Sequence, residues 1–410
     1  MKLKTKYRLG LCILLLMNLV AVGFAYYVTC QNSIPDSIQL VIDDSSEFDY
    51  KIPAIGTISD AENEIDSVDL KSKFVLKTQT SGNYTMETKL FGFLKLKEVA
   101  IEALERQSVA PSGEITGIYI ETDGLFVIDT AEVETASGSE SPAKNKLSSG
   151  DYIMKVDGKA ITSKMKFMEA INDSSGKAVV LTVMRKGKLV NVKIVPVLDE
   201  EDNHYKIGAY IRNNTQGIGT ITYTQGKNFA ALGHGISDID LGSLLSIKGG
   251  QIYQAEISSL KKGTAGSPGE IVGIIDYNKT HLQGSIEKNT ENGIFGTLNT
   301  ENPEKQIPVA LKQEVETGEA KIISCISGER EEYKIEITSV DKGNNEKLKG
   351  MQIKVIDPKL KELTNGIIQG MSGSPIIQNG RIVGAVTHVF VSDPTKGYGI
   401  FIENMLDAAG

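Results

Sequence analysis

Short apolar runs separated by glycine-rich turns fill the second half of this 410-residue chain. The chain has 41 glycines against 11 prolines, and runs of this length bounded by turn residues are typical of β-strands. Many such strands with few helices favour a β-barrel or a β-sandwich. The clearest runs are residues 217–223, 247–257, 271–277, 333–337 and 351–356. The sequence therefore predicts a mainly β fold, with room for two small barrels between residue 203 and the end.

One turn in this half places Ser372 between glycines, in the run of residues 370–375. A serine hydroxyl attacks a carbonyl only if it is exposed, held by a base, and close to N–H groups that can bind the oxyanion. Glycines beside Ser372 allow backbone conformations that a Cβ would forbid. A Gly-x-Ser-Gly turn alone is common in β proteins. His234, between glycines in residues 232–235, supplies a candidate base, and the two motifs together predict a serine endopeptidase.

The order of the candidate residues fits two-barrel, chymotrypsin-like peptidases, in which the first barrel gives the base and the second the nucleophile. His234 would take the proton of Ser372 and return it to the leaving amine. A carboxylate would hold the imidazole in the right tautomer. Asp357, on the strand leading toward the serine bend, is the first choice, and Asp238, four residues after the histidine, is the alternative. The N–H groups of Gly370 and Ser372 would form the oxyanion hole.

Other histidines and turns compete with these assignments. His204 and His281 lie in polar segments and are predicted to be solvated. His388 lies on an apolar strand, where a hydrogen-bonded core histidine is expected, with a backup role as the base. Ser374 is a rival nucleophile, although the proline that follows it indicates a structural turn. Residues 263–269 resemble the nucleophile turn and predict either a structural hairpin or a substrate-facing loop.

The first thirty residues indicate where the protein is located. Basic residues precede an uncharged run from Leu9 to about Tyr27, close to the roughly 20 apolar residues that a helix needs to cross a bilayer. Such a basic flank keeps the N-terminus in the cytoplasm. A secretory signal would have a shorter apolar core and a small-x-small cleavage site, of which residues 22–25 are a poor example. We expect a retained single-pass anchor, and otherwise a cleaved signal, with the bulk of the protein outside the cytoplasm.

Residues 31–100 are polar and acidic with short β-like stretches, which predict a small β module or an ordered stalk. No catalytic pattern is visible in them. The run Leu90-Phe91-Gly92-Phe93-Leu94 is expected to be a buried strand and not a binding patch.

Residues 101–200 contain a Gly-Asp-x-Ile strand at 150–153 that leads into a Val-Asp-Gly turn at 156–158, followed by a short helix at 164–173. This part of the chain resembles a PDZ domain of the kind found with bacterial proteases. The groove of such a domain binds an extended peptide by adding it to a sheet edge. The alternative is that the module only packs against the peptidase. By this resemblance, the loop that holds the peptide carboxylate is formed by Gly124, Leu125 and Phe126.

Residues 231–238, 366–380 and 384–390 are similar to the SpoIVB peptidase family of endospore-forming bacteria, which has anchor, PDZ domain and peptidase in this order. The resemblance implies a peptidase domain over residues 201–410 with Asp357 as the acid. It also implies an enzyme exported during sporulation into the space between the forespore and mother-cell membranes. There it would cleave itself and a membrane-bound regulator of an intramembrane protease, which triggers pro-sigma-K processing. The alternative is an envelope scaffold with a PDZ domain and an inactive barrel.

Charge and composition restrict the partners. A net charge of −8 without Lys/Arg clusters opposes nucleic-acid binding. No Walker loop or zinc-ligand spacing is present, so no cofactor or metal is expected. Three cysteines cannot form a disulfide framework, although Cys30 and Cys325 could pair outside a membrane. The expected partners are protein and peptide substrates and, through the anchor, the membrane.

Overall fold

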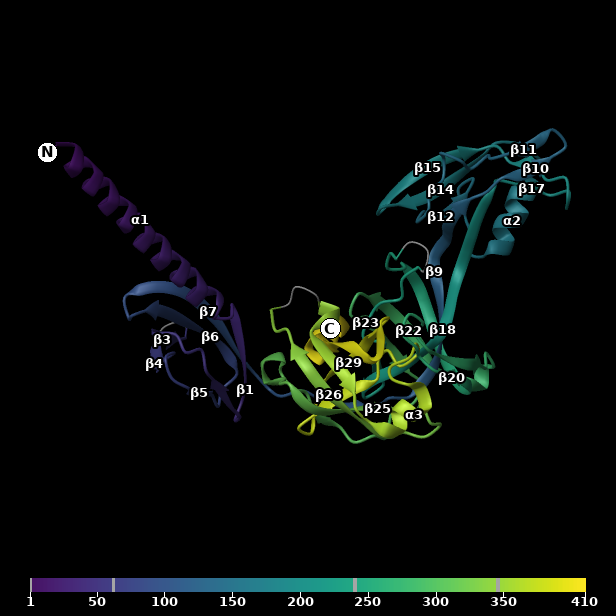
Figure 1. Ribbon diagram of the computed structural model, residues 1–410. Coiled ribbons are helices and arrows are strands. Elements are labelled where there is room, and N and C mark those ends of the chain that lie inside the picture. The colour runs from purple at the N-terminus through teal and green to yellow at the C-terminus, as the bar shows by residue number, and fades with distance from the viewer. Residues whose placement is uncertain (1, 61–62, 239–241, 344–346) are drawn as a thin grey trace. The chain divides into compact units, whose positions relative to one another are not determined.

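The computed structural model describes residues 2–60, 63–238, 242–343 and 347–410, and the chain is mainly β, as predicted (Figure 1). The chain forms two compact units, Met1–Gln107 and Ser108–Gly410. The first unit contains an N-terminal helix and a small β module, and the second contains the PDZ and peptidase regions. Each unit is described below by itself.

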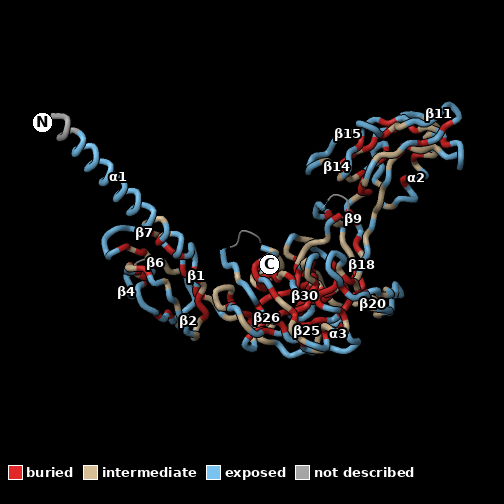
Figure 2. Tube along the Cα trace, in the orientation of Figure 1, coloured by how far each residue is buried: buried red, intermediate tan, exposed pale blue. Residues whose placement is uncertain are grey.

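The helix α1 (Lys2–Asn32) begins the first unit. Its segment Tyr7–Asn32 has a mean hydropathy of 2.3, and none of its most apolar part is buried against the protein. The helix is exposed along most of its length in Figure 2. Its length and composition suggest a membrane anchor or a signal sequence.

The β module of the first unit is a five-stranded sheet in the order β1-β7-β6-β3-β4. Buried and exposed residues alternate along β6 and β7, because one face of the sheet packs onto the core of the module. Ile38, Met86 and Val99 are among the fully buried side chains. The strands are β1 (Ser37–Val41), β2 (Ser45–Phe48), β3 (Ala54–Ser59), β4 (Glu64–Asp69), β5 (Phe74–Lys77), β6 (Gly82–Leu90) and β7 (Leu94–Leu104).

The run at residues 90–94 is not a buried strand, so that prediction is wrong. Strand β6 ends at Leu90, and Phe91 and Gly92 have φ angles of 52° and 80°, which make a hairpin turn into β7. The side chains of Phe91 and Phe93 are 60% and 78% exposed. Five apolar residues in a row looked like a strand, but the glycine between the aromatics marks a turn.

The PDZ region of the second unit has the elements that the sequence predicts. Helix α2 covers Lys164–Asp173 and is capped by the Ser163 hydroxyl, which accepts from the Lys166 N–H. The turn after β12 has positive φ at Asp157 and Gly158. The remaining elements are β10 (Val133–Thr135), β11 (Gly138–Glu140), β12 (Tyr152–Val156), β13 (Lys159–Ala160), β14 (Val179–Arg185), β15 (Lys188–Ile194), β16 (Val197–Leu198) and β17 (Tyr205–Lys206).

The first part of the peptidase region is a ring of six strands. In the order β9-β20-β22-β23-β19-β18, each strand pairs with the next, and β18 pairs back with β9. Its interior is apolar, with Ile120, Ala231, Ile252 and Ile294 among the fully buried residues. The strands here are β8 (Ser108–Pro111), β9 (Ile115–Thr130), β18 (Ala209–Gln225), β19 (Asn228–Ala231), β20 (Ile247–Lys261), β21 (Glu270–Ile275), β22 (Leu282–Thr290), β23 (Gly293–Leu298) and β24 (Ile307–Pro308).

The second part is a closed barrel in the order β25-β26-β27-β30-β29-β28. Its core includes Ile322, Ile335, Val355 and Val386. Cys325, beside this core, and Cys30, in the first unit, are free thiols. The elements are β25 (Gly318–Ser324), β26 (Glu331–Val340), β27 (Met351–Val355), α3 (Pro358–Thr364), β28 (Pro375–Gln378), β29 (Arg381–Phe390), β30 (Asp393–Phe401) and α4 (Ile402–Ala409).

Two long strands belong to both the PDZ region and the first barrel. Strand β9 pairs with β12 of the PDZ sheet at Leu125 and Phe126, and with β18 and β20 of the barrel before that. Strand β18 accompanies β9 from Ala209 to Thr220. The PDZ region is therefore joined to the peptidase by a two-stranded ribbon, which Figure 1 shows rising from the barrel.

Candidate active site

Ser372 lies on a tight bend just before β28 of the second barrel. The flanking Gly370 and Gly373 have φ angles of 100° and 97°, which a side chain rarely adopts. A Cβ on Gly373 would lie 2.6 Å from the N atom of Leu232, so the bend packs directly on the segment that leads to His234. The Ser372 hydroxyl donates to the carbonyl oxygen of Thr387 at 2.7 Å. The glycines of the motif thus allow both the conformation and the close approach.

His234 follows strand β19 of the first barrel, and its ring is mostly buried. Its Nδ1 lies 2.9 Å from the carbonyl oxygen of Gly235. A carbonyl oxygen only accepts, so this bond requires the proton on Nδ1 and leaves Nε2 as an acceptor. Burial lowers the pKa of His234 below its usual value, and the bond to Gly235 only partly opposes this. The imidazole is therefore neutral at pH 7 and carries its free lone pair on Nε2.

Thr220 of β18 joins the two segments. Its N–H donates to the Ser372 carbonyl at 3.2 Å, and its own carbonyl accepts from the Leu232 N–H at 3.1 Å. Its hydroxyl donates to the Gly370 carbonyl at 2.7 Å. One residue thus ties the nucleophile bend of one barrel to the histidine segment of the other. Among the described contacts, the Ser372 hydroxyl bonds Thr387 and not His234.

The structure does not bring Asp357 to His234. Asp357 is the N-cap of α3, and its carboxylate accepts from the N–H groups of Lys359 at 2.9 Å, Leu360 at 3.1 Å and Lys334 at 3.2 Å. These donors use both carboxylate oxygens, which explains why the side chain turns toward the helix. In this conformation the Gly235 carbonyl orients the imidazole.

Asp238, the alternative acid, is buried but faces the PDZ ribbon. Its carboxylate lies 3.7 Å from the Arg212 guanidinium of β18. Eight residues after Asp238, the Ser246 N–H donates to the hydroxyl of Tyr152 on β12 of the PDZ region at 3.0 Å. The histidine segment is therefore connected to the PDZ region through side chains.

His388 on β29 is not a core histidine, contrary to the expectation. Its side chain is exposed at the surface, and its ring centroid lies 5.1 Å from that of His234. Partial desolvation, with the nearby His234 and Lys349, lowers the pKa of His388 to about 4. Sequence reasoning placed it on the right strand but assumed that an apolar strand buries every residue. Strand alternation would not have found it, because every residue from Ile382 to Thr387 is buried and the exposed part of β29 begins only at His388.

The surface exposure of the other candidate bases and of the rival nucleophile shows their surroundings. His204 and His281 are at the surface, as predicted, and bond Asp202 and Asp276 respectively. Ser374 is fully buried, and its hydroxyl has no hydrogen-bond partner among the described residues. A hydroxyl in that position cannot meet a substrate.

The N–H groups of Gly370 and Ser372 donate no hydrogen bond to another residue that the structure describes. The neighbouring Gly373 N–H, in contrast, donates to Val386 at 2.8 Å. This leaves two donors of the bend without an internal acceptor, which is the arrangement that an oxyanion hole requires.

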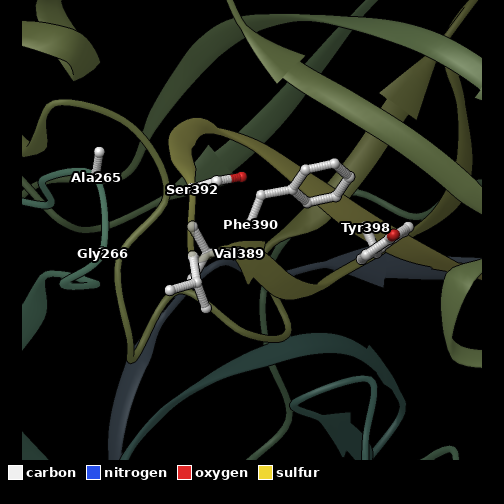
Figure 3. A pocket seen from close by; sticks show the side chains of 7 residues that line it. Ala265, Gly266, Val389, Phe390, Ser392 and Tyr398 are labelled. Atoms are coloured by element: carbon white, nitrogen blue, oxygen red, sulfur yellow. The ribbon is translucent and has the colours of Figure 1, made fainter.

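A surface pocket of about 700 Å³ adjoins the strand that carries His388 (Figure 3). Strand β28 pairs with β29 as far as Ala385, and Ser374 and Gly373 bond the backbone of Val386, so the edge of β29 that is open toward the site begins after Val386. The Gly266 N–H donates to the Val391 carbonyl at 2.8 Å, which brings the 263–269 loop to the pocket. The lining is mostly apolar and consists of Ala265, Gly266, Val389, Phe390, Val391, Ser392 and Tyr398.

A second cavity of about 190 Å³ lies on the PDZ region. Gly124 and Leu125, two of the three residues predicted to hold a peptide carboxylate, line it together with Met154 and Lys248. Phe126 does not, because it is buried and its ring packs 5.1 Å from that of Tyr152. Sequence reasoning missed Lys248, which comes from the far strand β20 and was not visible in the PDZ segment.

The fold and the site define a class: a mainly β, serine-peptidase-like protein with a PDZ region. Comparison with known proteins identifies the family, because residues 203–406 match the family model for SpoIVB peptidase S55. Residues 121–195 match the PDZ domain model. The chain therefore carries a peptidase domain of the SpoIVB S55 family together with a PDZ domain, and its substrates are proteins or peptides.

Two solved structures are similar to parts of the chain. The PDZ domain of the SdrC-like protein from Listeria monocytogenes is 24% identical over 22% of this chain and 87% of that one, with a TM-score of 0.18. The Rv3671c protease of M. tuberculosis, in an inactive form, is 14% identical over 47% of this chain and 84% of that one, with a TM-score of 0.27.

Proposed function

We propose that this protein is a serine endopeptidase in which Ser372 is the nucleophile and His234 the general base. The observation that carries the proposal is Thr220, which holds the serine bend and the histidine segment at one point between the barrels. His234 is neutral and offers Nε2 as an acceptor, as a general base must. His388 lies beside it and completes an imidazole pair at the mouth of the site.

The reaction begins when the Ser372 hydroxyl leaves the Thr387 carbonyl and attacks the scissile carbonyl of a peptide. Its proton passes to Nε2 of His234 and then to the leaving amine, which gives an acyl-enzyme that water hydrolyses by the same route. The N–H groups of Gly370 and Ser372 stabilise the oxyanion, for which several kcal/mol of transition-state stabilisation is typical.

Asp357 is the candidate acid of the triad. The family resemblance supports Asp357, whereas its contacts in this conformation are those of a helix cap. For Asp357 to reach the imidazole, the segment before α3 must move and give up the bonds to Lys359 and Leu360. Until then, the Gly235 carbonyl orients the imidazole by itself.

A substrate chain would lie along the open edge of β29 after Val386 and place an apolar side chain in the adjoining pocket. β-Strand addition supplies backbone hydrogen bonds, and the lining by Val389, Phe390 and Val391 supplies apolar contact. The PDZ cavity, with Gly124, Leu125 and Lys248, would hold a second peptide segment by its carboxylate.

In the cell we propose the role that the family resemblance supports. The enzyme is exported during sporulation, cleaves itself, and cleaves a membrane-bound regulator of an intramembrane protease, which triggers pro-sigma-K processing. The apolar helix α1 agrees with a site of action at a membrane outside the cytoplasm.

The test uses the full chain in detergent or vesicles, beside its Ser372→Ala variant. Fragments are followed by mass spectrometry, and the nucleophile is labelled with a fluorophosphonate. Ser374→Ala is the matched control, because its hydroxyl is buried two residues away. We expect cleavage and labelling of the original chain and of Ser374→Ala but not of Ser372→Ala. Folded protein that stays intact and unlabelled in all three forms would favour the PDZ scaffold instead.

A further inference from the structure

The hairpin between β6 and β7 presents an apolar tip to solvent. Phe91 and Phe93 are 60% and 78% exposed, and Ile55 and Leu94 beside them are 47% and 45% exposed. The two aromatic rings stack with centroids 6.5 Å apart, and a Cβ on Gly92 would lie 3.4 Å from Ile55, so the four side chains form one patch. Single exposed apolar residues are normal on a surface, but a contiguous aromatic patch marks a contact site.

Hydrogen bonds fix this hairpin against the end of α1. The Tyr27 hydroxyl donates to the Lys95 carbonyl at 2.9 Å, and the Gln31 side chain donates to the Leu96 carbonyl at 3.1 Å. The end of α1 and the start of β7 therefore run in the same direction, because Tyr27 bonds Lys95 and the later Gln31 bonds the later Leu96. Going back along β7 from Lys95 to Phe93 therefore leads toward the apolar segment of α1. The aromatic tip lies on the side of the module that faces the span Tyr7–Asn32.

The residues behind the tip are suited to lipid headgroups. Lys89 and Lys95 are directly opposite each other in the hairpin, one step behind Leu90 and Leu94. Both ammonium groups are near Glu87, at 3.2 and 3.5 Å, and stay at the surface. Phenylalanine and leucine side chains with lysines behind them are typical of segments that lie in the membrane interface, with the apolar groups among the acyl chains and the ammonium groups at the headgroups.

We propose that this hairpin tip, formed by Ile55, Phe91, Phe93 and Leu94, inserts into the membrane interface beside α1. The partner is the lipid bilayer itself, as the helix of the same unit indicates. The tip acts as a second attachment point and fixes the orientation of the β module on the membrane surface. This inference does not depend on the catalytic proposal.

The sequence makes a direct test simple, because the chain contains no tryptophan. A Phe93→Trp variant of the full chain is reconstituted in vesicles of phosphatidylcholine and phosphatidylglycerol, with and without brominated acyl chains. The control is Val75→Trp on β5, which is 58% exposed. Strand β5 lies near the Leu104 end of β7, since Thr78 bonds Asp43 and Ile42 bonds Leu104. That end is about 30 Å from Lys95 along the strand.

We expect brominated lipid to lower the emission of the Phe93→Trp variant at least about twofold and to leave the Val75→Trp variant unchanged. Replacing Phe91 by Asp in the Phe93→Trp background should restore most of the emission, because a carboxylate is costly in the interface. Equal quenching at both positions, or none at position 93, would overturn the proposal. Both tryptophans replace exposed apolar residues, so we expect the two variants to fold. The thermal unfolding transition of each variant checks this.

Discussion

The two sides of the candidate active site are held in different ways. The Ser372 bend is fixed by backbone bonds and by glycines that pack against Thr220 and Leu232. The segment after His234 has backbone bonds too, such as that from the Gly235 N–H to the Glu291 carbonyl at 3.1 Å, but it also relies on side chains of other elements. The Asn289 amide donates to the Ile236 and Leu245 carbonyls, and Asp238 lies beside Arg212 of the ribbon. Backbone bonds inside packed barrels are hard to change, whereas side-chain contacts on a loop change more easily.

This difference indicates that the PDZ ribbon can affect the position of His234 more easily than that of Ser372. The packed barrels hold the Ser372 bend, although its hydroxyl still bonds the Thr387 carbonyl, and the histidine segment depends in addition on contacts with another region.

The histidine pair gives the largest effect. His234→Ala should lower kcat/KM by about 10²- to 10⁴-fold, because a general base contributes that much. His388→Ala should cost less than about tenfold, because it is next to the base and not on the proton path. Peptide cleavage by the two folded variants measures the difference. The reverse order would move the base to His388.

The glycine bend gives the next effect. Gly373→Ala would place a Cβ against Leu232 at a φ of 97°, and we expect a loss of about 3 kcal/mol in the free energy of unfolding. Gly217→Ala, with nothing within 4 Å of the new Cβ, is the matched control and should change stability by less than about 1 kcal/mol. Denaturant titration compares them. Similar stability of the two variants would contradict the rigid bend.

The acid assignment can be separated from the capping role. Asp357→Ala should cost about 1 kcal/mol of stability, because α3 loses its N-cap. Asp357→Asn keeps one acceptor oxygen for the cap and loses the bond from the Lys334 N–H, so we expect a smaller loss of stability than in Asp357→Ala and cleavage within a few-fold of the original. If Asp357→Asn were stable but more than about a hundredfold slower, the carboxylate would act on His234 in the working enzyme.

The ribbon contact should have a smaller effect. Arg212→Ala removes the cation next to buried Asp238, and we expect kcat/KM to fall about threefold to tenfold. Fluorophosphonate labelling of Ser372 should fall by the same factor, because labelling also needs the base. The double variant Arg212→Ala/Asp238→Asn should recover part of the loss, since it removes the buried carboxylate charge together with the cation beside it. Unchanged rates would show that the His234 segment, like the Ser372 bend, does not depend on contacts with the PDZ ribbon.

The pH dependence should show the smallest change. His234 must be neutral to accept a proton, and burial lowers its pKa. Activity therefore stays constant as the pH falls through 6.5, the ordinary value for histidine, and declines only below it. The kcat/KM profile from pH 5 to 8 measures this. An acid limb centred above 6.5 would contradict the buried, neutral base.

The sequence predicted the repeated strands, the PDZ elements and the glycine-flanked bend at Ser372. These features depend on local patterns: period-2 alternation, glycine turns, and a capped helix at residues 164–173. The exposure of His388, the cap role of Asp357 and the Thr220 bonds were not predictable, because they depend on which strands meet across the barrels. The turn at Phe91 was predicted as a buried strand, because the four apolar residues around Gly92 favour a strand and the glycine was not taken as the sign of a turn.

The ribbon of β9 and β18 has a consequence for dissecting the protein. The PDZ region contributes half of β9, and the other half is a stave of the first barrel that pairs with β18 and β20. Excising residues 121–195 would end β9 at Ile120 and remove its pairs with β20 at Glu121 and Thr122 and with β18 at Glu121 and from Phe126 to Thr130. A truncation that abolishes cleavage would then report damage to the barrel end of the ribbon together with the loss of the PDZ region. Single substitutions in the peptide cavity are the interpretable way to separate the two regions.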